Sequence, residues 1–152
     1  MTKKFAVWTV ALFCSLAISA QTDIDKKGPV ISFAETDFNF GSFSQENGVQ
    51  SHYFVFTNTG DEVLMLTEVY GSCNCTVPEY PKTPVAPGDS DSIKVTYNGK
   101  SLRPGIFHKF VTVNYNASKP DDSMVRLKII GEMVDNKVYE QMSSKKKPAD
   151  TK

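Results

Sequence analysis

The chain has 152 residues, 22% of them charged, and its 17 Lys and Arg residues balance 17 Asp and Glu residues. This length accommodates one domain of ordinary size and excludes two. The balanced charge excludes the strongly basic surface that nucleic-acid-binding proteins need, so we expect no nucleic-acid partner.

The first twenty residues have the layout of a secretory signal peptide. Lys3 and Lys4 form a basic start, residues 5–18 are an apolar run, and small residues follow up to Ala20. The run is too short, and too soon followed by polar residues, for a membrane span. We therefore predict a signal peptide over residues 1–20, cleaved near Ala20. The mature protein is expected to be extracytoplasmic, periplasmic or secreted, with no transmembrane segment.

Cleavage at this point changes the cysteine content. It removes Cys14 together with Trp8, and it leaves Cys73 and Cys75 as the remaining cysteines. The extracytoplasmic compartment permits disulfides.

The mature sequence begins with a short polar stretch and continues with a period of two. Residues 21–29 end in a Gly-Pro breaker and are predicted to form a flexible lead. From residue 30 to residue 134, apolar and polar residues alternate in short runs separated by turn residues, which is typical of strands. The predicted strands cover residues 30–33, 38–43, 51–57, 63–69, 92–97, 107–115 and 125–134.

A proline segment follows the two cysteines. Pro78, Pro81, Pro84 and Pro87 recur at every third residue, which is the period of a polyproline II helix. Proline has no N–H group for a strand ladder, so the segment is predicted to be a sheet edge or a crossover. A docking ligand for a partner is the alternative. Pro87 and Gly88 suit the central positions of a type II turn.

Residues 135–152 lose the period of two and gather polar residues and lysines. They are predicted to form a polar tail that is disordered or weakly helical. The pattern as a whole predicts an all-β, immunoglobulin-like two-sheet sandwich of about seven to eight strands over residues 30–134.

Several motifs together resemble a known bacterial family. They are Phe54-x-Phe56-Thr57-Asn58-Thr59-Gly60, Leu64-x-Leu66, Ser72-Cys73-Asn74-Cys75-Thr76, Pro87-Gly88 and Ile93-x-Val95-x-Tyr97-Asn98. They are similar to an extracytoplasmic family catalogued as a domain of unknown function, number 1573. The resemblance covers residues 33–134. It implies an immunoglobulin-like domain similar to Hydin-type and major-sperm-protein-like domains, and it implies no reaction. The family usually has Gly where this chain has Asn74.

The spacing of Cys73 and Cys75 constrains the backbone between them. In a flat strand, the Cβ atoms of residues i and i+2 lie about 7 Å apart. A disulfide needs about 3.5–4.5 Å. Bonding between the two cysteines therefore requires a turn at Asn74, and Gly and Asn are the residues that most readily adopt left-handed φ. We predict a tight, hairpin-like cysteine loop with Asn74 in that conformation.

Three roles for Cys73 and Cys75 remain open. The pair is a structural disulfide, or two packed thiols, as in many extracytoplasmic domains. Alternatively, two thiolates bind a soft metal, copper or zinc, with His52 and His108 as the histidines available to complete the site. In the third interpretation, the pair exchanges disulfides with a partner.

The sequence contains no nucleophile elbow, no His-Glu-x-x-His motif and no glycine-rich phosphate loop. We therefore expect no enzymatic activity and no resident cofactor. The leading hypothesis is a non-catalytic, secreted or periplasmic module that acts by contact with a protein or cell-envelope partner. Exposed sheet edges and the proline segment are the expected contact surfaces. Soft-metal binding or thiol–disulfide exchange at Cys73 and Cys75 is the alternative.

Overall fold

The computed structural model describes residues 28–146. The predicted signal peptide, residues 21–27 of the predicted lead and residues 147–152 of the tail lie outside the described residues.

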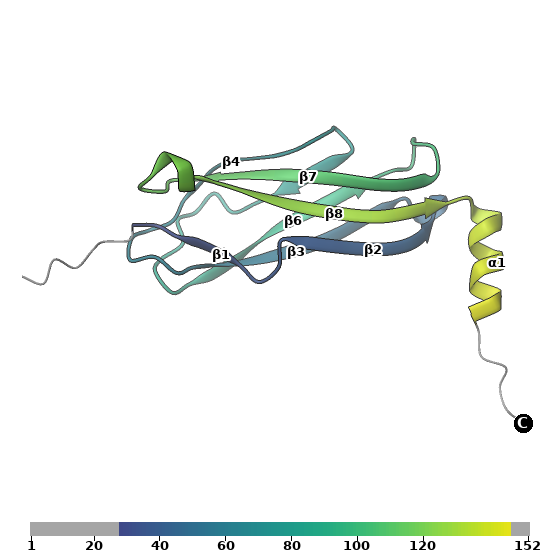
Figure 1. The fold of residues 1–152 in the computed structure, drawn as a ribbon, viewed down its shortest axis with the longest axis horizontal. Coiled ribbons are helices and arrows are strands. Elements are labelled where there is room, and N and C mark those ends of the chain that lie inside the picture. Colours follow the sequence, from purple (N-terminus) through teal and green to yellow (C-terminus); the bar gives the residue numbers. More distant parts are fainter. Residues whose placement is uncertain (1–27, 147–152) are drawn as a thin grey trace, which may run out of the picture.

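Eight strands form two facing sheets of four (Figure 1). Sheet A has the strand order β1-β3-β6-β5, and sheet B has the order β2-β8-β7-β4. In chain order the strands are β1 (Ile31–Phe33), β2 (Asp37–Ser44), β3 (Val49–Asn58), β4 (Leu66–Gly71), β5 (Thr76–Glu79), β6 (Ser90–Asn98), β7 (Gly105–Tyr115) and β8 (Met124–Val134). The predicted immunoglobulin-like sandwich is confirmed.

The period of two explains which side of each strand is buried. In β3, Phe54 and Phe56 are completely buried, whereas Tyr53 and Val55, which alternate with them, are exposed. Neighbouring strands pair antiparallel, with one exception in the described part of the chain: β2 runs parallel to β8. The chain crosses from sheet A to sheet B between β1 and β2, and β2 then lies beside β8, the last strand in the chain, and runs in the same direction.

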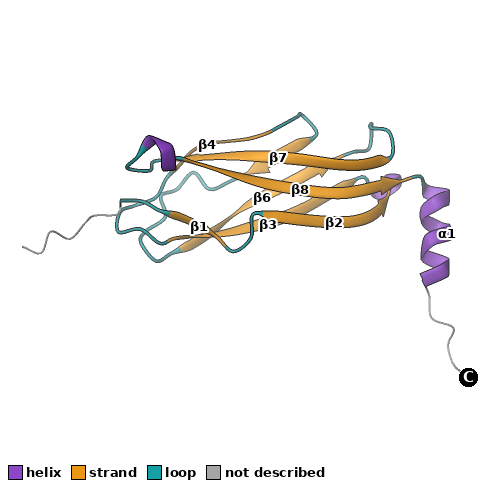
Figure 2. Cartoon of the chain, viewed as in Figure 1, coloured by secondary structure: helices purple, strands orange, loops and turns teal. Residues whose placement is uncertain are grey.

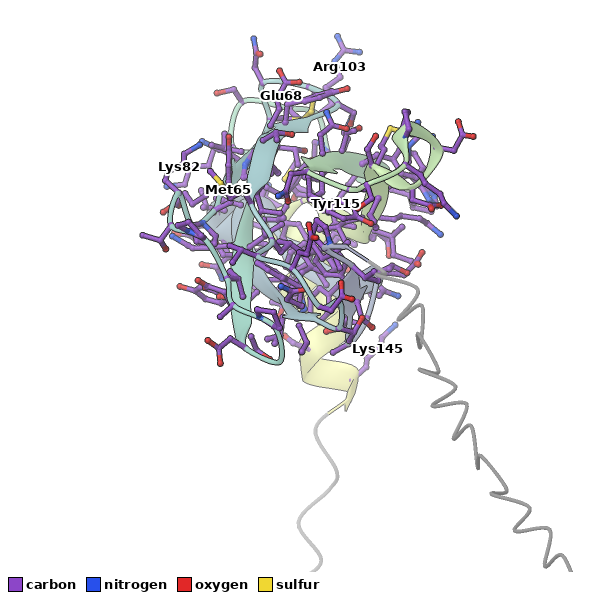
Figure 3. All side chains as sticks on the ribbon, turned by 90° about the vertical axis from the view of Figure 1, so that its left-hand side faces the viewer. Met65, Glu68, Lys82, Arg103, Tyr115 and Lys145 are labelled. Atoms are coloured by element: carbon purple, nitrogen blue, oxygen red, sulfur yellow. A yellow bond between two sulfur atoms is a disulfide. The ribbon has the colours of Figure 1, made fainter. Side chains whose placement is uncertain are left out.

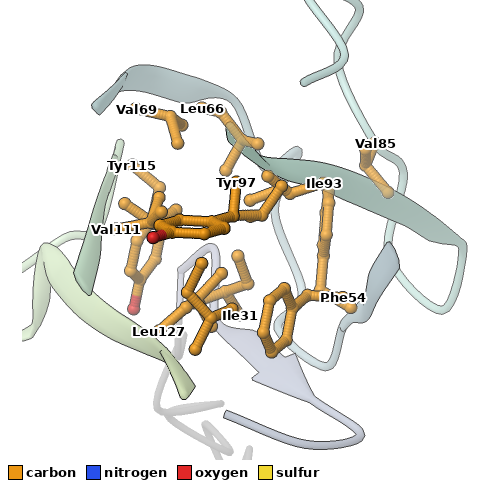
Figure 4. Packing of buried hydrophobic residues seen from close by; sticks show 14 of the residues in the cluster. Ile31, Phe54, Leu66, Val69, Val85, Ile93, Tyr97, Val111, Tyr115 and Leu127 are labelled. Carbon is orange, nitrogen blue, oxygen red and sulfur yellow. The ribbon is translucent and has the colours of Figure 1, made fainter. Parts of the chain in front are cut away.

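The core lies between the sheets. Figure 4 shows side chains of sheet A, such as Phe54 and Tyr97, directed toward side chains of sheet B, such as Val111 and Leu127. The rings of Tyr97 and Phe107 stack with their centroids 3.8 Å apart and so join the two sheets. This contact adds an aromatic pair to the burial of apolar area that drives folding.

The helices lie at the ends of the sandwich (Figure 2). Two are short 3₁₀ turns, η1 (Gln45–Asn47) and η2 (Pro120–Asp122). The third, α1 (Asn136–Lys146), follows β8 and projects from the end of the sandwich (Figure 1). None of the helices in the described range is long and apolar enough to cross a membrane.

Helix α1 lies where the sequence predicts a disordered or weakly helical tail. Asp135 supplies its N-terminal cap: its Oδ1 accepts a hydrogen bond from the Lys137 N–H at 3.0 Å. The Asn136 side chain accepts another from the Glu46 N–H at 3.0 Å, which fixes the start of the helix to η1. Capping of this kind satisfies N–H groups that a helix start leaves unpaired. Apolar periodicity alone does not reveal such capping, because the capping side chains are polar.

The domain begins earlier than predicted. Gly28 and Pro29, assigned from sequence to the flexible lead, are buried. The carbonyl of Gly28 accepts a hydrogen bond from the Asp61 N–H at 3.2 Å. The turn that ends β3 therefore holds these two residues.

The proline segment begins as a sheet edge, which is one of the two predicted alternatives. Pro78 lies in β5, an edge strand of sheet A, and Pro81, Pro84 and Pro87 lie in the connection from β5 to its antiparallel neighbour β6, so the segment is not a crossover between sheets. Leu64 and Val85 form an isolated antiparallel bridge, so the predicted strand over residues 63–69 joins sheet B only from Leu66. The Asp89 N–H donates to the Ala86 carbonyl at 3.0 Å, and Gly88 has φ of 84°, which confirms the type II turn.

Candidate functional site

Residues 71–76, named here the cysteine corner, carry the chain from one sheet to the other. They connect β4, an edge strand of sheet B, to β5, an edge strand of sheet A. Backbone hydrogen bonds attach both ends: the Ser72 N–H donates to the Phe110 carbonyl and the Asn98 N–H to the Cys75 carbonyl, each at 2.8 Å. The corner is thus part of the framework of both sheets.

The two cysteines of the corner form a disulfide in this structure. Their Sγ atoms lie 1.98 Å apart and their Cα atoms 5.2 Å apart. In a flat strand, two Cα atoms at this spacing lie about 6.6–6.8 Å apart. The shorter distance reflects a turn in which the Thr76 N–H donates to the Cys73 carbonyl at 3.0 Å.

The conformation predicted for Asn74 is wrong. Every residue with positive φ in the described part of the chain is a glycine, so Asn74 is not left-handed. A type I turn reverses the chain with negative φ at both central positions and accepts most residues there. Asn74 and Cys75 occupy those positions, so the ability of Asn to adopt a left-handed φ does not explain its presence at position 74.

Gly71 is a residue of the corner to which the sequence argument gave no role. A Cβ atom on Gly71 would lie 2.0 Å from the carbonyl oxygen of Thr76. No side chain fits at that distance, so glycine is required where the end of β4 passes the start of β5. The signal in the sequence is a glycine directly before the cysteine motif.

Thr76 is the second residue of the corner to which the sequence argument gave no role. It is 3% exposed, and its Oγ1 lies 3.5 Å from Sγ of Cys73 and 3.8 Å from Sγ of Cys75. Both cysteines are half-buried, and Cys75 packs against the hydrophobic core. The corner therefore places a buried hydroxyl against a partly accessible disulfide.

The two histidines do not join the cysteines. His52 stacks on Phe38 with ring centroids 3.5 Å apart, and its Nε2 lies 2.8 Å from Oε1 of Glu35. His108 lies on β7 and lines a hollow on the outer face of sheet B. Across the described residues, no group of three or more His, Cys, Asp or Glu side chains is arranged to hold a metal ion.

The hollow on sheet B is shallow, about 220 Å³, and lies beside the β-bulge of β2. Ile106, Ile130 and His108 are among its lining residues. Ile106 is 73% exposed, which is unusual for a large apolar side chain.

Charged groups border this face. Nζ of Lys128 lies 3.1 Å from Oδ1 of Asp37, and hydrogen bonds from Lys128 and then Thr36 lower the pKa of the Asp37 carboxyl. The guanidinium of Arg126 lies 5.7 Å from the ring centroid of Phe110. Polar and charged groups therefore surround the apolar side chains of the outer face. In the end-on view of Figure 3, Glu68 and Lys82 point outward, whereas Tyr115 lies between the layers.

A family model described as Protein of unknown function (DUF1573) matches residues 31–133. The chain belongs to this family. The resemblance read from the cysteine and turn motifs is therefore confirmed. No curated protein sequence matches the chain.

Solved structures share the fold at low sequence identity. A protein of unknown function from Porphyromonas gingivalis W83 has a TM-score of 0.60 at 17% identity, over 70% of this chain and 48% of the other. The ASH/PapD-like domain 7 of human CEP192 has a TM-score of 0.53 at 10% identity, over 83% of this chain and 99% of that domain. The secreted serine protease VesC from Vibrio cholerae has a TM-score of 0.53 at 16% identity, over 78% and 26% respectively.

The DUF1573 chain thus spans about half the length of the Porphyromonas protein and about a quarter of VesC. At these identities the comparisons establish an immunoglobulin-like, PapD-like sandwich and do not transfer an activity.

Proposed function

We propose that this DUF1573 protein is a non-catalytic, extracytoplasmic module that acts by contact with another protein of the cell envelope. The signal-peptide pattern of residues 1–20 supports the compartment. The sandwich fold supports a binding role, because such folds present large, rigid sheet faces and edges.

The observation that carries the proposal is the outer face of sheet B. Ile106 and Phe110 stand on the same face of β7, and both are exposed. Ile130 is paired with His108 between them, and exposed Tyr70 is paired with Thr112 on the next strand. Together these side chains make an apolar row across three strands of one face.

Exposure of such a row of apolar side chains to water is unfavourable in free energy. Single exposed apolar residues are ordinary, whereas apolar residues gathered on one face and bordered by polar groups mark interaction sites. Exposed tyrosine and phenylalanine are also the residue types enriched in the centres of protein interfaces. The shallow hollow beside Ile106 offers space for a side chain of the partner.

Site-specific photo-crosslinking in the intact cell envelope tests this proposal. A crosslinking residue at position 106 should give a discrete crosslinked band, which weakens when Phe110→Asp is added. The matched control is position 53, where Tyr53 is 57% exposed on the outer face of sheet A. Equal crosslinking from positions 106 and 53, or no effect of Phe110→Asp, would overturn the assignment of the contact face.

A second candidate function is chemistry at Cys73 and Cys75. It is favoured by the position of the disulfide at a half-buried corner and by its separation of only two residues. Thiol–disulfide exchange needs an accessible bond of this kind. Soft-metal binding would need the reduced pair, with copper or zinc held by the two thiolates.

Thiol alkylation with mass spectrometry, before and after reduction, separates these chemical roles from a structural one. A stable disulfide that resists glutathione would contradict both. Two free thiols that bind copper one-to-one, with binding lost in Cys73→Ser, would favour the metal.

A further inference from the structure

The hydroxyl of Thr76 is buried against the two sulfur atoms of the cysteine corner. Among the described residues, its hydrogen-bond partners are Sγ of Cys73 and Sγ of Cys75, at 3.5 Å and 3.8 Å. Disulfide sulfur is a weak acceptor, whereas a thiolate is charged and accepts strongly. The burial of this hydroxyl is therefore better compensated when the cysteine pair is reduced than when it is oxidised.

Backbone hydrogen bonds hold the corner in addition to the disulfide. The Thr76 N–H donates to the Cys73 carbonyl, and backbone bonds from Ser72 to Phe110 and from Asn98 to Cys75 attach the corner to both sheets. A cross-link over two residues closes a very small loop, so it removes little entropy from the unfolded chain. The bond can therefore open and close while the domain stays folded.

The two sulfur atoms differ in their surroundings. Cys75 packs against the core, whereas Cys73 lies outside that cluster, between the exposed residues Ser72 and Asn74. Both cysteines are half-buried, so the packing of Cys75 against the core is the difference that favours attack at Sγ of Cys73. Sγ of Cys75 is the sulfur placed to leave toward the protein interior.

We propose that the cysteine corner oxidises dithiols, with Cys73 as the attacked sulfur, Cys75 as the leaving thiolate and Thr76 as a positioning residue that donates a hydrogen bond to that thiolate. This inference rests on the thiol–disulfide exchange named above as the second candidate function. It specifies the substrate class, a protein or peptide dithiol, and the order of the two steps.

In the first step, one thiolate of the dithiol attacks Sγ of Cys73 and forms a mixed disulfide. The Cys73–Cys75 bond breaks, and its electron pair passes to Sγ of Cys75. In the second step, the other thiolate of the dithiol attacks its neighbour in the mixed disulfide, and Cys73 leaves as a thiolate. The dithiol is oxidised to a disulfide, and the cysteine pair gains two electrons. The protons from the dithiol pass to solvent or to the two new thiols.

The first experiment treats the oxidised mature protein with dithiothreitol, without denaturant, and counts thiols by alkylation and mass spectrometry. We expect both thiols to become free while the circular dichroism spectrum keeps its native form. Reduction that occurs only in denaturant would overturn both the exchange function and this inference.

The second experiment identifies the attacked sulfur. Cys75→Ser and Cys73→Ser each leave one thiol, which is allowed to form a mixed disulfide with oxidised glutathione. We expect Cys73 in Cys75→Ser to react at least about tenfold faster than Cys75 in Cys73→Ser, because only Cys75 packs against the core. Equal rates, or a faster reaction at Cys75, would contradict the assignment and leave the exchange function standing if the first experiment succeeds.

The third experiment concerns Thr76. Thr76→Val removes the hydroxyl with little change in shape, and Thr76→Ser retains it. In Thr76→Val, the alkylation of reduced Cys75, followed with Cys73→Ser in the background, should require a higher pH. Reduction of the disulfide by dithiothreitol should slow by about tenfold, as expected for loss of a hydrogen bond to a charged group. Thr76→Ser should restore both values.

A purely structural role for Thr76 would change stability without shifting the pH profile of alkylation. An unchanged profile in Thr76→Val would therefore overturn the role of Thr76. If Thr76→Val does not fold, Thr76→Ala measured against Thr76→Ser decides the same question.

Discussion

Asn58 illustrates what one buried polar side chain does in this fold. It is fully buried at the end of β3, where its Nδ2 donates to the carbonyls of Glu62 at 2.8 Å and Val85 at 3.0 Å. Its Oδ1 accepts from the Gly60 N–H at 3.0 Å. One side chain thus closes the turn after β3 and attaches it to the connection between β5 and β6. Buried polar groups are tolerated when they are paired in this way.

Replacing Asn58 by Ala should destabilise the protein by about 2–4 kcal/mol. The Gly60 N–H and the Glu62 carbonyl would each lose the hydrogen bond to this side chain, and alanine offers no replacement. Urea unfolding followed by circular dichroism measures the loss. Asn74→Ala is the matched control, since Asn74 is exposed in a turn. A loss for Asn58→Ala no larger than that of the control would show that water replaces these hydrogen bonds without cost.

Two buried tyrosines predict a loss of stability at alkaline pH. Burial raises the pKa of Tyr97 and of Tyr115 above the ordinary value of 10.0. The unfolded chain therefore loses these phenolic protons at lower pH than the folded chain. Their contribution to the free energy of unfolding is constant below about pH 10 and falls as the pH rises beyond it.

Tyr97→Phe should remove part of this alkaline loss. The slope of the unfolding free energy between about pH 10 and 11.5 should be shallower than in the native protein. Tyr70→Phe is the control for loss of a phenolic hydroxyl at an exposed position, because Tyr70 is 48% exposed. Identical slopes for all three proteins would mean that burial of Tyr97 does not govern its titration. Glu79 and, more weakly, Tyr53 raise the pKa of Lys94, and all three residues are present in every variant of this comparison.

At the scale of the elements, the cysteine corner depends on a close approach between two strands. The end of β4 passes the start of β5 so closely that Gly71 has no room for a Cβ atom. The approach lets the chain cross between sheets in six residues while backbone hydrogen bonds continue on both sides. A short crossing of this kind keeps buried backbone groups paired.

Gly71→Ala should therefore destabilise the protein by about 2 kcal/mol or more, since the neighbour that must move is backbone and not a flexible side chain. Thr67→Ala, at an exposed position of β4, should change stability by about 0.5 kcal/mol or less. Thermal unfolding of the oxidised proteins provides the comparison. Equal midpoints for the two variants would show that β4 and β5 separate easily.

At the scale of the whole molecule, two four-stranded sheets enclose one core, and both outer faces carry exposed apolar side chains, such as Tyr53 and Val55 on sheet A. The outer face of sheet A carries hydroxyl pairs, including Ser51 with Thr96 at 2.9 Å and Thr57 with Ser90 at 2.7 Å. The outer face of sheet B carries the apolar row around Ile106 and Phe110. Ile106, which is 73% exposed, is the most exposed large apolar side chain in the described part of the chain, and it is the basis for placing the proposed contact on sheet B.

The mature form of the whole chain provides a further prediction. If residues 1–20 are a cleaved signal peptide, the purified extracytoplasmic protein begins near Gln21 and shows no tryptophan fluorescence, because Trp8 is the single tryptophan. Intact mass and emission spectra measure both properties. Tryptophan emission from the mature protein would contradict cleavage at this point.

The sequence alone was sufficient for the class of fold, because the burial of one strand face leaves a period of two. In β8, the alternation of Leu127 and Ile129 with Arg126 and Lys128 identifies the inner face, and the structure agrees. One turn was also predictable from the sequence, since Pro87 and Gly88 specify a type II turn by their own backbone preferences.

Tertiary structure decided everything that depends on contacts between distant residues. Periodicity does not state which strands are neighbours, so the parallel pairing of β2 with β8 and the exposed row around Ile106 emerge only from the folded chain. The burial of Thr76 and the absence of space at Gly71 also depend on how β4 and β5 pack, although few residues separate them in the chain. The backbone preferences of individual residues act over a few positions, so the sequence alone predicts them. Burial and close approach are properties of two segments at once, and they exist only when the sheets pack.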